Sequence, residues 1–380
     1  MEISNELISE KITIEEIKRT EQLVSLQEEW GELLSRSDAP TPFCTWIWVN
    51  SWWKNFQHDR ELHTLLIRER HPSDATPGRL LGIAPFYIRF SGGVPIRIRT
   101  LTLLGAESAF TERHDIIAAK DKRHVVTTAV AEYLIKREGE LWDIMEWEGV
   151  GRDDLPTEIA DKVESETKQV YSIGELATSW ETFFKSLNPS MRRNLRYYPR
   201  LIHRHGHQSD ARIVSDASEV EFVVREFLRL HQARAEMAGG EQHMNRFDSV
   251  ESQLFLRETM LEFAKMRILR AAVLTIDGQT ASVQLTFLHN DTLYVYYSGF
   301  DPRWRKYAPS AHALSICVRH GIESGARKID FLSFMAPYKR SWGAKPYLRS
   351  ETVFSRSSVF VELARGVRHL KRQFHLFFDR

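Results

Sequence analysis

Hydrophobic and polar residues follow one another along the chain in two successive series of strand-like and helical patterns. In the first half, alternating residues predict a strand at 12–17. Apolar residues three and four positions apart then predict a helix at 20–34, and an aromatic-rich helix follows at 45–56. The other predicted elements of this half are strands at 61–70, 79–90, 96–105 and 114–119, a helix at 121–139 and a closing strand at 142–150.

The second half repeats this order, with more helices before its strands. The Asp277-Gly278 pair between two apolar runs predicts a tight hairpin. The predicted helices are 179–187, 190–204, 217–237, 249–266 and 310–324, and the predicted strands are 267–277, 280–288, 292–300 and 328–334.

Both halves close with a helix, a glycine, a short turn and a strand that carries one acid, Asp143 or Asp330. This repetition predicts an internal duplication, with two α/β domains of one type. The alternative is a chance similarity between two helix–strand units. Because the stretch 151–170 is polar and Glu-rich, we expect domains at 1–172 and 173–356, followed by a C-terminal helix at 357–380.

The composition is that of a soluble globular protein and narrows the class of partner. The chain has 380 residues, 42% hydrophobic and 27% charged, which fits about two domains with substantial cores. A net charge of +1 provides no overall field that would attract DNA, so we expect no DNA partner and any basic site must be local. Two cysteines, a polar acidic N-terminus and no apolar run of membrane-spanning length predict a cytoplasmic protein.

The segment SGFDPRWRKYAPSAH, at 298–312, joins a predicted strand to a predicted helix and contains three cations. A strand, a loop and a helix N-terminus in this order favour phosphate binding, because the first backbone N–H groups of a helix lack helical partners. Arg303, Arg305 and Lys306 are then placed to reach a pyrophosphate or a ribose 3′-phosphate, with Ser310 as the helix cap. The alternative is an ordinary solvated connection, because the turn lacks the glycine that a phosphate cradle usually contains.

Residues 182–209 are strongly basic and contain no acid. Pro199 should kink or break a helix here near Tyr198. This run is either a docking surface for an anionic substrate, carrier or polyanion, or a solvated face over a core stripe. Its alternating histidines have no Cys or carboxylate neighbours, so we expect no metal site. Four arginines are spaced so that a helix would place them on one face: Arg192, Arg196, Arg200 and Arg204.

Two further clusters combine titratable groups near predicted loops. His231 and Arg234 lie three apart just before a Gly-Gly break, where they would line a pocket or form an ordinary surface pair. Asp330 lies on a predicted buried strand, and Tyr338 and Lys339 follow it. An acid, a phenol and an amine together suit proton transfer or charge stabilisation. The alternative is an aspartate that caps a turn and a tyrosine that covers the core.

The C-terminal stretch 357–380 has the spacing of a basic amphipathic helix. We expect it to pack against the protein itself. The alternative is contact with a partner protein or with the inner membrane face, which would make the protein peripheral to that membrane.

Several motifs of the second half occur in an order that resembles a known family. They are RRNLRYYPRL, FLRLHQAR, a loop ending in Phe247, YVYYSGFDP and KIDFLSFMAPYKRSWG, within residues 175–355. In this order they resemble the GNAT-type acetyltransferases associated with bacterial cellulose and exopolysaccharide biosynthesis. These enzymes are related to the Fem-type peptidoglycan aminoacyltransferases, which have two GNAT-like halves. The first half is similar more loosely, through PFCTWIWVNSWW, LLGIAPFY and LTLLGA.

The resemblance implies a mixed α/β fold and transfer of an acyl group, acetyl in the first instance, from acyl-CoA to an amine without a metal. The acceptor amine would belong to a small molecule or a carrier-linked precursor, as a sugar, peptide or polysaccharide. The implied catalytic residues are Tyr338 and Lys339, oriented by Asp330. The implied acyl-CoA contacts are Arg303, Arg305, Lys306, Ser310 and Ala311. The implied acceptor contacts are Arg193, Arg196, His231, Arg234 and Asp301.

Two positions depart from the family pattern and keep two alternatives open. Pro309-Ser310 stands where the family has Pro-Gly, and Phe334 and Met335 stand where it has a glycine and an acid. The first alternative is a Fem-like transferase that takes its acyl group from aminoacyl-tRNA, which the basic run favours. The second is a catalytically degenerate binding or scaffold protein of the same fold.

Overall fold

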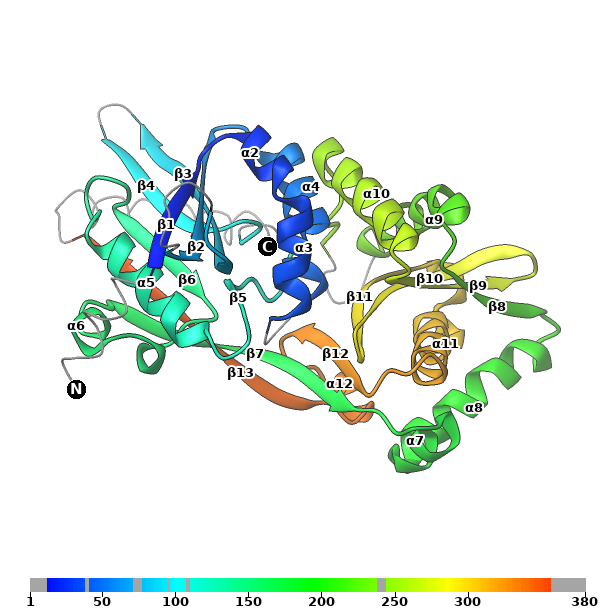
Figure 1. Ribbon diagram of the computed structural model, residues 1–380. Helices are drawn as coiled ribbons and strands as arrows, with labels where there is room; N and C mark the ends of the chain where they lie inside the picture. The colour runs from blue at the N-terminus through cyan, green and yellow to red at the C-terminus, as the bar shows by residue number, and fades with distance from the viewer. Residues whose placement is uncertain are drawn as a thin grey trace. The chain divides into compact units, whose positions relative to one another are not determined.

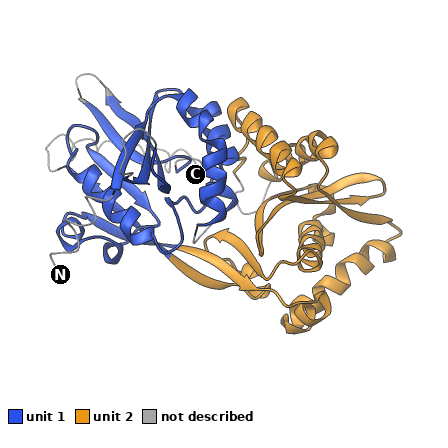
Figure 2. Ribbon diagram, in the orientation of Figure 1, with its two compact units in different colours: residues 1–169, 349–380 blue, residues 170–348 orange. Residues whose placement is uncertain are grey.

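The computed structural model describes residues 12–37, 41–70, 77–93, 96–106, 110–237 and 244–356 (Figure 1). The C-terminal helix predicted at 357–380 lies outside these residues. The chain forms two compact units, unit 1 with residues 1–169 and 349–380, and unit 2 with residues 170–348 (Figure 2). The first boundary lies close to the one predicted. Residues 349–356 differ from the prediction, because they belong to unit 1.

Unit 1 begins with a strand and three α-helices and continues with a run of strands. In chain order, the described part starts with β1 (Ile12–Ile17), α2 (Thr20–Ser25), α3 (Gln27–Ser35), the 3-10 helix η1 (Pro42–Cys44) and α4 (Trp46–Phe56). They are followed by β2 (Arg60–Glu69), β3 (Leu80–Gly93), β4 (Ile96–Leu103), β5 (Ile117–Ala118), α5 (Arg123–Ile135), β6 (Ile144–Glu148) and α6 (Thr157–Ala160).

The main sheet of unit 1 has the order β1-β2-β3-β4-β6-β13, where β13 is Lys345–Ser355. Neighbouring strands are antiparallel except β4 and β6, which are parallel. One apolar cluster joins this sheet to α5 and includes Leu101, Met145 and Trp147, all fully buried. The burial of these large side chains is the main source of stability of the unit.

Unit 2 has the same kinds of elements, preceded by two additional helices. It contains α7 (Trp180–Ser186), α8 (Pro189–Arg204), β8 (Ser209–Val214), α9 (Val220–Ala235), α10 (Val250–Lys265), β9 (Leu269–Ile276) and β10 (Gln279–His289). These are followed by β11 (Thr292–Phe300), the 3-10 helix η4 (Pro302–Tyr307), α11 (Pro309–Glu323), β12 (Lys328–Ser333) and α12 (Pro337–Ser341).

The sheet of unit 2 has the order β7-β12-β11-β10-β9-β8, where β7 is Ser165–Glu175. Only β11 and β12 are parallel. The predicted hairpin between β9 and β10 is confirmed, with Asp277 and Gly278 at φ angles of 50° and 75°. Two positive φ angles in a two-residue turn match the twist of antiparallel strands.

The two units share one order of elements, which supports the predicted duplication. Each has a first strand, a helical layer, three antiparallel strands, a helix and a strand parallel to the third, and then a short helix. The fold class is therefore the expected one, an α/β fold with mixed sheets. The strand that follows the short helix of one series pairs with the other series. β7 follows α6 but pairs with β12, and β13 follows α12 but pairs with β6.

Helix α8 spans two apolar clusters of unit 2. Met191 and Leu195 pack against the cluster that contains Leu314 and Val318, and Ile202 belongs to the cluster that contains Cys317. The helix runs without interruption from 189 to 204, so of the kink or break predicted at Pro199 the break does not occur. Packing at both ends offsets the loss of one helical hydrogen bond at the proline.

None of the helices in the described part of the chain is long and apolar enough to cross a membrane.

Candidate active site

The parallel strands β11 and β12 pair at only three positions and then separate. The pairs are Thr292 with Lys328, Leu293 with Ile329 and Tyr294 with Asp330, although β11 continues to Phe300 and β12 to Ser333. The helix between them, α11, begins beyond the end of β11 (Figure 1). In an α/β sheet, such a separation of neighbouring parallel strands at their carboxyl ends is a usual position for a ligand.

Strand β11 is irregular where the separation begins. Thr286 of β10 pairs with Val295, but Gln284 pairs with Ser298, so β11 has one residue more than its partner over this interval. The amide of Gln284 donates to the Tyr297 carbonyl at 3.1 Å and stabilises the irregular backbone. Bulges of this kind are common beside active sites, because they redirect backbone groups and side chains.

The end of β12 has an unusual backbone conformation. Leu332 and Phe334 have φ angles of 63° and 50°, which non-glycine residues rarely adopt. The buried carboxylate of Asp330 accepts a hydrogen bond from the Leu332 N–H at 2.8 Å. The strain is held by surrounding contacts, which is frequent at functional sites.

Phe334 occupies the position where the resembled family has glycine. Its positive φ keeps the backbone shape that glycine adopts easily, and its ring is 64% exposed. The departure therefore preserves the backbone and adds an apolar ring at the surface.

Lys339 of α12 fixes the backbone at the end of β12. Its ammonium group donates to the Ser333 carbonyl at 2.5 Å and to the Phe334 carbonyl at 2.9 Å, and it lies 4.0 Å from the centre of the Phe334 ring. Lys339 is 2% exposed and Asp330 is fully buried. Two of the three predicted catalytic residues, Lys339 and Asp330, thus fix the backbone at the end of β12, and neither presents a side chain to the surface.

Tyr338 is the predicted catalytic residue that does reach the surface. Its side chain is 51% exposed, and the Phe331 ring lies edge-on to it with 6.2 Å between centroids. Desolvation of the hydroxyl raises the Tyr338 pKa, and the nearby Arg234 guanidinium partly offsets this effect. The phenol therefore keeps its proton at neutral pH and is suited to donate one.

His231 and Arg234 do not share one environment, although both lie on α9. His231 is fully buried among Phe227, Phe247 and Tyr297, and burial lowers its pKa to about 4. Its Nδ1 lies 3.3 Å from the Ser298 carbonyl, so His231 joins α9 to β11 and does not face an acceptor as predicted.

Gly299 explains how α9 comes so close to β11. A Cβ atom at this position would lie 2.7 Å from the His231 backbone nitrogen, closer than side chains tolerate. Arg234, one turn further along α9, is half-buried and donates to the Ser298 hydroxyl at 3.4 Å. Arg234 and Ser298 thus lie together beside the irregular part of β11.

Asp301 and Arg303 contact each other directly. The Asp301 carboxylate caps η4 by accepting from the Arg303 N–H at 3.0 Å, and it pairs with the Arg303 guanidinium at 2.6 Å. This pairing lowers the Asp301 pKa. Asp301, predicted to contact the acceptor, therefore stabilises the loop before α11 and engages one of the three predicted phosphate ligands. Arg305 and Lys306 remain exposed.

The cap of α11 lies two residues before the predicted one. Pro309 is the first helical residue, and the cap is Ala308, with a φ of 47° and no side chain that accepts a hydrogen bond. Ser310 is therefore not the cap. Its hydroxyl is buried in the second helical position and has no hydrogen-bond partner among the described residues.

A cavity of about 70 Å³ lies between α8 and the first turn of α11. Ala311 and His312 line it from α11, and the buried Nδ1 of His312 has no hydrogen-bond partner among the described residues. Burial and the neighbouring His203 lower the His312 pKa. From α8, the lining residues are Met191, Asn194, Leu195, Tyr198 and Pro199. The predicted acceptor ligands Arg193 and Arg196 are exposed on the outer side of the same helix.

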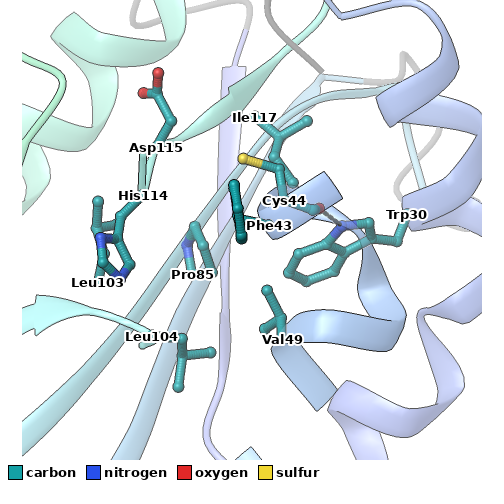
Figure 3. Close-up of a pocket in the computed structure, with 10 residues that line it drawn as sticks. All are labelled: Trp30, Phe43, Cys44, Val49, Pro85, Leu103, Leu104, His114, Asp115 and Ile117. Carbon is teal, nitrogen blue, oxygen red and sulfur yellow. Dashed lines mark hydrogen bonds between the residues drawn. The ribbon is translucent and has the colours of Figure 1, made fainter. Parts of the chain in front are cut away.

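Unit 1 has a corresponding region, which is filled by its own side chains. There β4 and β6 pair at two positions, Thr100 with Ile144 and Leu101 with Met145. Beyond them, Leu103 and Leu104 are buried. A cavity of about 10 Å³ lies nearby, lined by Cys44 and His114 among others, with room for no more than about one water molecule (Figure 3).

A buried charged cluster closes this region of unit 1, and the sequence did not reveal it. His114 Nδ1 lies 2.8 Å from the Glu148 carboxylate, and Arg349 donates to the His114 carbonyl and to the Asp115 carboxylate, both at 2.9 Å. Arg123 also contacts Asp115, at 2.8 Å. The partners are up to 235 positions apart, so no local pattern could have indicated them.

In the described ranges, no group of three or more His, Cys, Asp or Glu residues is arranged to hold a metal ion.

Comparisons with known proteins concern the second unit and the fold. Residues 189–340 match the family model described as Acetyltransferase (GNAT) domain. No curated protein matches the chain. The crystal structure of FemX is similar over 89% of this chain and 98% of that chain, with 10% identity and a TM-score of 0.56. A conserved protein of unknown function from Bacteroides thetaiotaomicron VPI-5482 is similar over 90% of this chain and 100% of that chain, with 10% identity and a TM-score of 0.52.

At this level of identity the solved structures support the fold alone. The family model adds the enzyme class, because it extends from the start of α8 into α12 and includes the part of unit 2 in which β11 and β12 separate. Residues 189–340 are similar to acetyltransferase domains of the GNAT type, and the chain is an acyltransferase, as expected.

Proposed function

We propose that the chain transfers an acyl group from acyl-CoA to an amine of a sugar, a peptide or a polysaccharide precursor. The observation that carries this proposal is the separation of β11 from β12 beyond Tyr294 and Asp330, next to an irregular segment of β11. A thioester between these strands would meet backbone donors on one side and Tyr338 on the other.

The chemistry needs little more than positioning, charge stabilisation and proton transfer. An N–H of the segment 295–298 polarises the thioester carbonyl as charge develops on its oxygen. The amine nitrogen bonds to the carbonyl carbon, and the carbon–sulfur bond breaks. Tyr338, whose pKa is raised, gives its proton to the departing thiolate, and the proton lost by the amine passes to water or to Tyr338.

Lys339 and Asp330 act as positioning residues in this scheme. Their contacts with the carbonyls and N–H groups of 332–334 hold the strained end of β12. Because α12 follows directly, they also fix the start of the helix that carries Tyr338. A 1 Å displacement of a catalytic group can reduce a rate about a hundredfold.

The donor and the acceptor would occupy different sides of Tyr338. Arg305, Lys306, Ser310 and Ala311 form the proposed donor end, because they lie where η4 meets α11. Arg234, beside Ser298 on β11, is the proposed acceptor contact. Arg193 and Arg196 are exposed on α8 and would contact an anionic part of a larger acceptor.

The cellular setting is also part of the proposal. The family resemblance favours exopolysaccharide biosynthesis, and the lack of a membrane-length apolar run in the sequence favours a cytoplasmic enzyme. We also propose a peripheral position at the inner membrane face, because the sequence of 357–380 has the spacing of a basic amphipathic helix.

The donor is tested first by calorimetry and thermal shift with saturating acetyl-CoA and longer acyl-CoAs. We expect heat of binding and a raised melting temperature, since a ligand that binds only the folded state stabilises it. Release of free CoA thiol is then followed with a panel of amino sugars, amino acids and lysine peptides. Absence of binding by every acyl-CoA contradicts the donor assignment. Salt-dependent binding of aminoacyl-tRNA would then favour the Fem-like alternative, and binding of neither donor would favour the scaffold alternative.

A further inference from the structure

Helix α8 presents a basic face without ion pairs. Arg193, Arg196, Arg200 and Arg204 are exposed, and Arg192 is half-buried. Within the described residues, no carboxylate forms an ion pair with any of these five guanidinium groups. Arginines four positions apart in a helix follow one another along one side, so this basic face extends over about 18 Å.

Other arginines of unit 2 behave differently. Arg257 pairs with Glu221, Arg319 with Glu323 and Arg229 with Glu226, at 2.7 to 2.8 Å. Exposed arginines of this unit therefore find local partners where carboxylates are near. The sequence from 182 to 209 excludes acids altogether, so the basic face is available to an external anionic surface.

The basic face adjoins the proposed donor end of the active site. The side of α8 opposite the basic face and the first turn of α11 enclose the cavity of about 70 Å³. At the end of α8, the His205 ring is hydrogen-bonded to the Tyr307 hydroxyl at 3.0 Å. Tyr307 closes η4, and the Lys306 ammonium lies 4.8 Å from its ring centre. An object docked on α8 would thus lie next to Arg305 and Lys306.

The first turn of α11 offers few groups to a pyrophosphate. Pro309 has no N–H, the Ala308 N–H donates to the Arg305 carbonyl at 3.1 Å, and the Ala311 N–H donates to the Ala308 carbonyl at 3.1 Å. Among these four described residues, Ser310 alone has a backbone N–H that donates to no other residue. A helix start that binds a pyrophosphate normally supplies several such donors.

We infer that α8 is the docking surface for an acidic carrier protein that presents the acyl group as a phosphopantetheine thioester. This inference rests on the proposed function and specifies its donor. A carrier-borne thioester has the phosphopantetheine arm and reacting carbonyl of acyl-CoA but lacks the 3′-phosphorylated AMP part. It needs one phosphate contact and a basic docking face, and unit 2 provides this combination.

The transfer step is balanced with this donor. The acceptor nitrogen forms its bond to the acyl carbon, the carbon–sulfur bond of the carrier thioester breaks, and the sulfur receives one proton. The products are the amide and the carrier with a free pantetheine thiol. No oxidant, reductant or metal takes part.

Two other anionic partners fit the basic face less well. A bilayer takes up apolar side chains together with basic ones, but the apolar side of α8 is packed into the two clusters of unit 2. Single-stranded RNA usually binds through several stacked aromatic rings, and Tyr197, 43% exposed, is the one large apolar side chain of α8 among the exposed residues of the described structure.

The test uses the full chain and an acyl carrier protein charged with an acetyl or an octanoyl group. Binding of the dye-labelled carrier is measured by fluorescence anisotropy, and turnover is measured with carrier-borne and CoA-borne donors. The variant is Arg200→Gln with Arg204→Gln. The matched control is Arg257→Gln with Arg319→Gln, which removes two exposed, ion-paired arginines of the same unit.

We expect the α8 variant to weaken carrier binding about tenfold and to raise the KM for the carrier-borne donor equally, because docking charges act on encounter and affinity. The KM for acyl-CoA should change less than twofold, and the control should bind like the wild type. Raising the salt concentration to about 0.3 M should weaken carrier binding selectively, since exposed charges are then screened within a few ångströms.

The outcomes separate this inference from the function it rests on. Turnover of acyl-CoA without carrier binding, or carrier binding that is equal in the variant and the control, overturns the inference and leaves the proposed function intact. Binding of tRNA or of anionic phosphatidylglycerol vesicles that is tighter than carrier binding and lost in the α8 variant also overturns it. If neither donor reacts, the proposed function fails, and the inference fails with it.

Discussion

Units 1 and 2 have the same order of elements, but they differ in the region beyond their parallel strand pairs. In unit 1, the region beyond the β4–β6 pairs is filled by buried leucines and by the His114–Glu148 and Arg349–Asp115 contacts. In unit 2, the region beyond the β11–β12 pairs has a bulge, two strained residues and an exposed tyrosine. In unit 1 this region is part of the core, and in unit 2 it is the proposed ligand site.

The difference shows that charge burial alone does not indicate a catalytic site. The cluster of unit 1 contains a histidine, two acids and two arginines, as many active sites do, but its cavity admits no substrate. At the end of β12 in unit 2, the ionic side chains of Asp330 and Lys339 are buried, and Tyr338 reaches the surface. Accessibility and backbone geometry distinguish the two regions better than the number of titratable groups.

The largest expected effect concerns stability in unit 1. Arg349→Met leaves Asp115 without one of its two arginine partners and removes the cation beside Glu148. We expect the free energy of unfolding to fall by about 3–5 kcal/mol, because an acid that loses its partner stays buried. Denaturant titration followed by tryptophan fluorescence measures this change. Arg257→Met, which removes an exposed pair, is the control and should change it by no more than about 1 kcal/mol. An equal effect of both substitutions would show that the unit 1 cluster is not the core we describe.

The next effect concerns catalysis in unit 2. Tyr338→Phe removes the proton donor and should lower kcat about a hundredfold, a usual contribution of general acid catalysis. Its melting temperature should stay close to that of the wild type, since the side chain is half exposed. Glu148→Gln in unit 1 is the opposite case, with reduced stability and an unchanged kcat. A Tyr338→Phe enzyme with normal kcat would remove this tyrosine from the chemistry.

Acidification should lower the stability of both units. His63 in unit 1 and His231 in unit 2 are buried, and burial lowers each pKa to about 4 from 6.5. The unfolded chain then binds more protons than the folded chain below pH 6.5, so stability falls as the pH falls toward 4. Between pH 7 and pH 5, each histidine should cost about 2 kcal/mol, from 1.36 kcal/mol per pKa unit.

The measurement is the free energy of unfolding at several pH values for the wild type, His63→Leu and His231→Gln. Each variant should lose about half of the acid sensitivity attributed to the two histidines. Variants that keep the full pH dependence would show that other groups cause it.

The smallest expected effect concerns the donor end of unit 2. Ser310→Gly removes a buried hydroxyl that has no partner among the described residues and frees space at the start of α11. We expect acyl-CoA to bind about threefold more tightly, in the direction of one improved backbone hydrogen bond to a charged group. Calorimetry measures the affinity, with Ser315→Gly further along α11 as the control. Weaker binding in Ser310→Gly would show that the serine itself contacts the donor.

Much of the fold could be predicted, because local patterns determine it. The long helices α9 and α11, the Asp277-Gly278 hairpin and the strands β9 to β11 all follow from periodicity and turn residues. Strands β7, β8 and β13 were not predicted. Their exposed residues weaken the alternation, and their pairing depends on strands far away in the sequence.

The sequence indicated where the candidate site lies but not how its side chains are arranged. The motif order indicated the loop 301–311 and the pair Tyr338-Lys339. The sequence could not show that Lys339 points inward to two carbonyls, that His231 is buried or that Ala308 is the cap, since each depends on tertiary contacts. The positive φ of Phe334 could not be read from a residue that rarely adopts it.

The exchanged strands have a consequence for how the protein is made. β6 of unit 1 obtains its neighbour β13 only when residues 351–355 exist, long after residue 169 has left the ribosome. At about 5–20 residues per second, this leaves unit 1 with an open sheet edge for roughly ten to forty seconds. An open edge attracts other strands, so the nascent chain passes through an interval in which aggregation competes with completion. Expression of a shortened chain that ends before β13 would make this interval permanent.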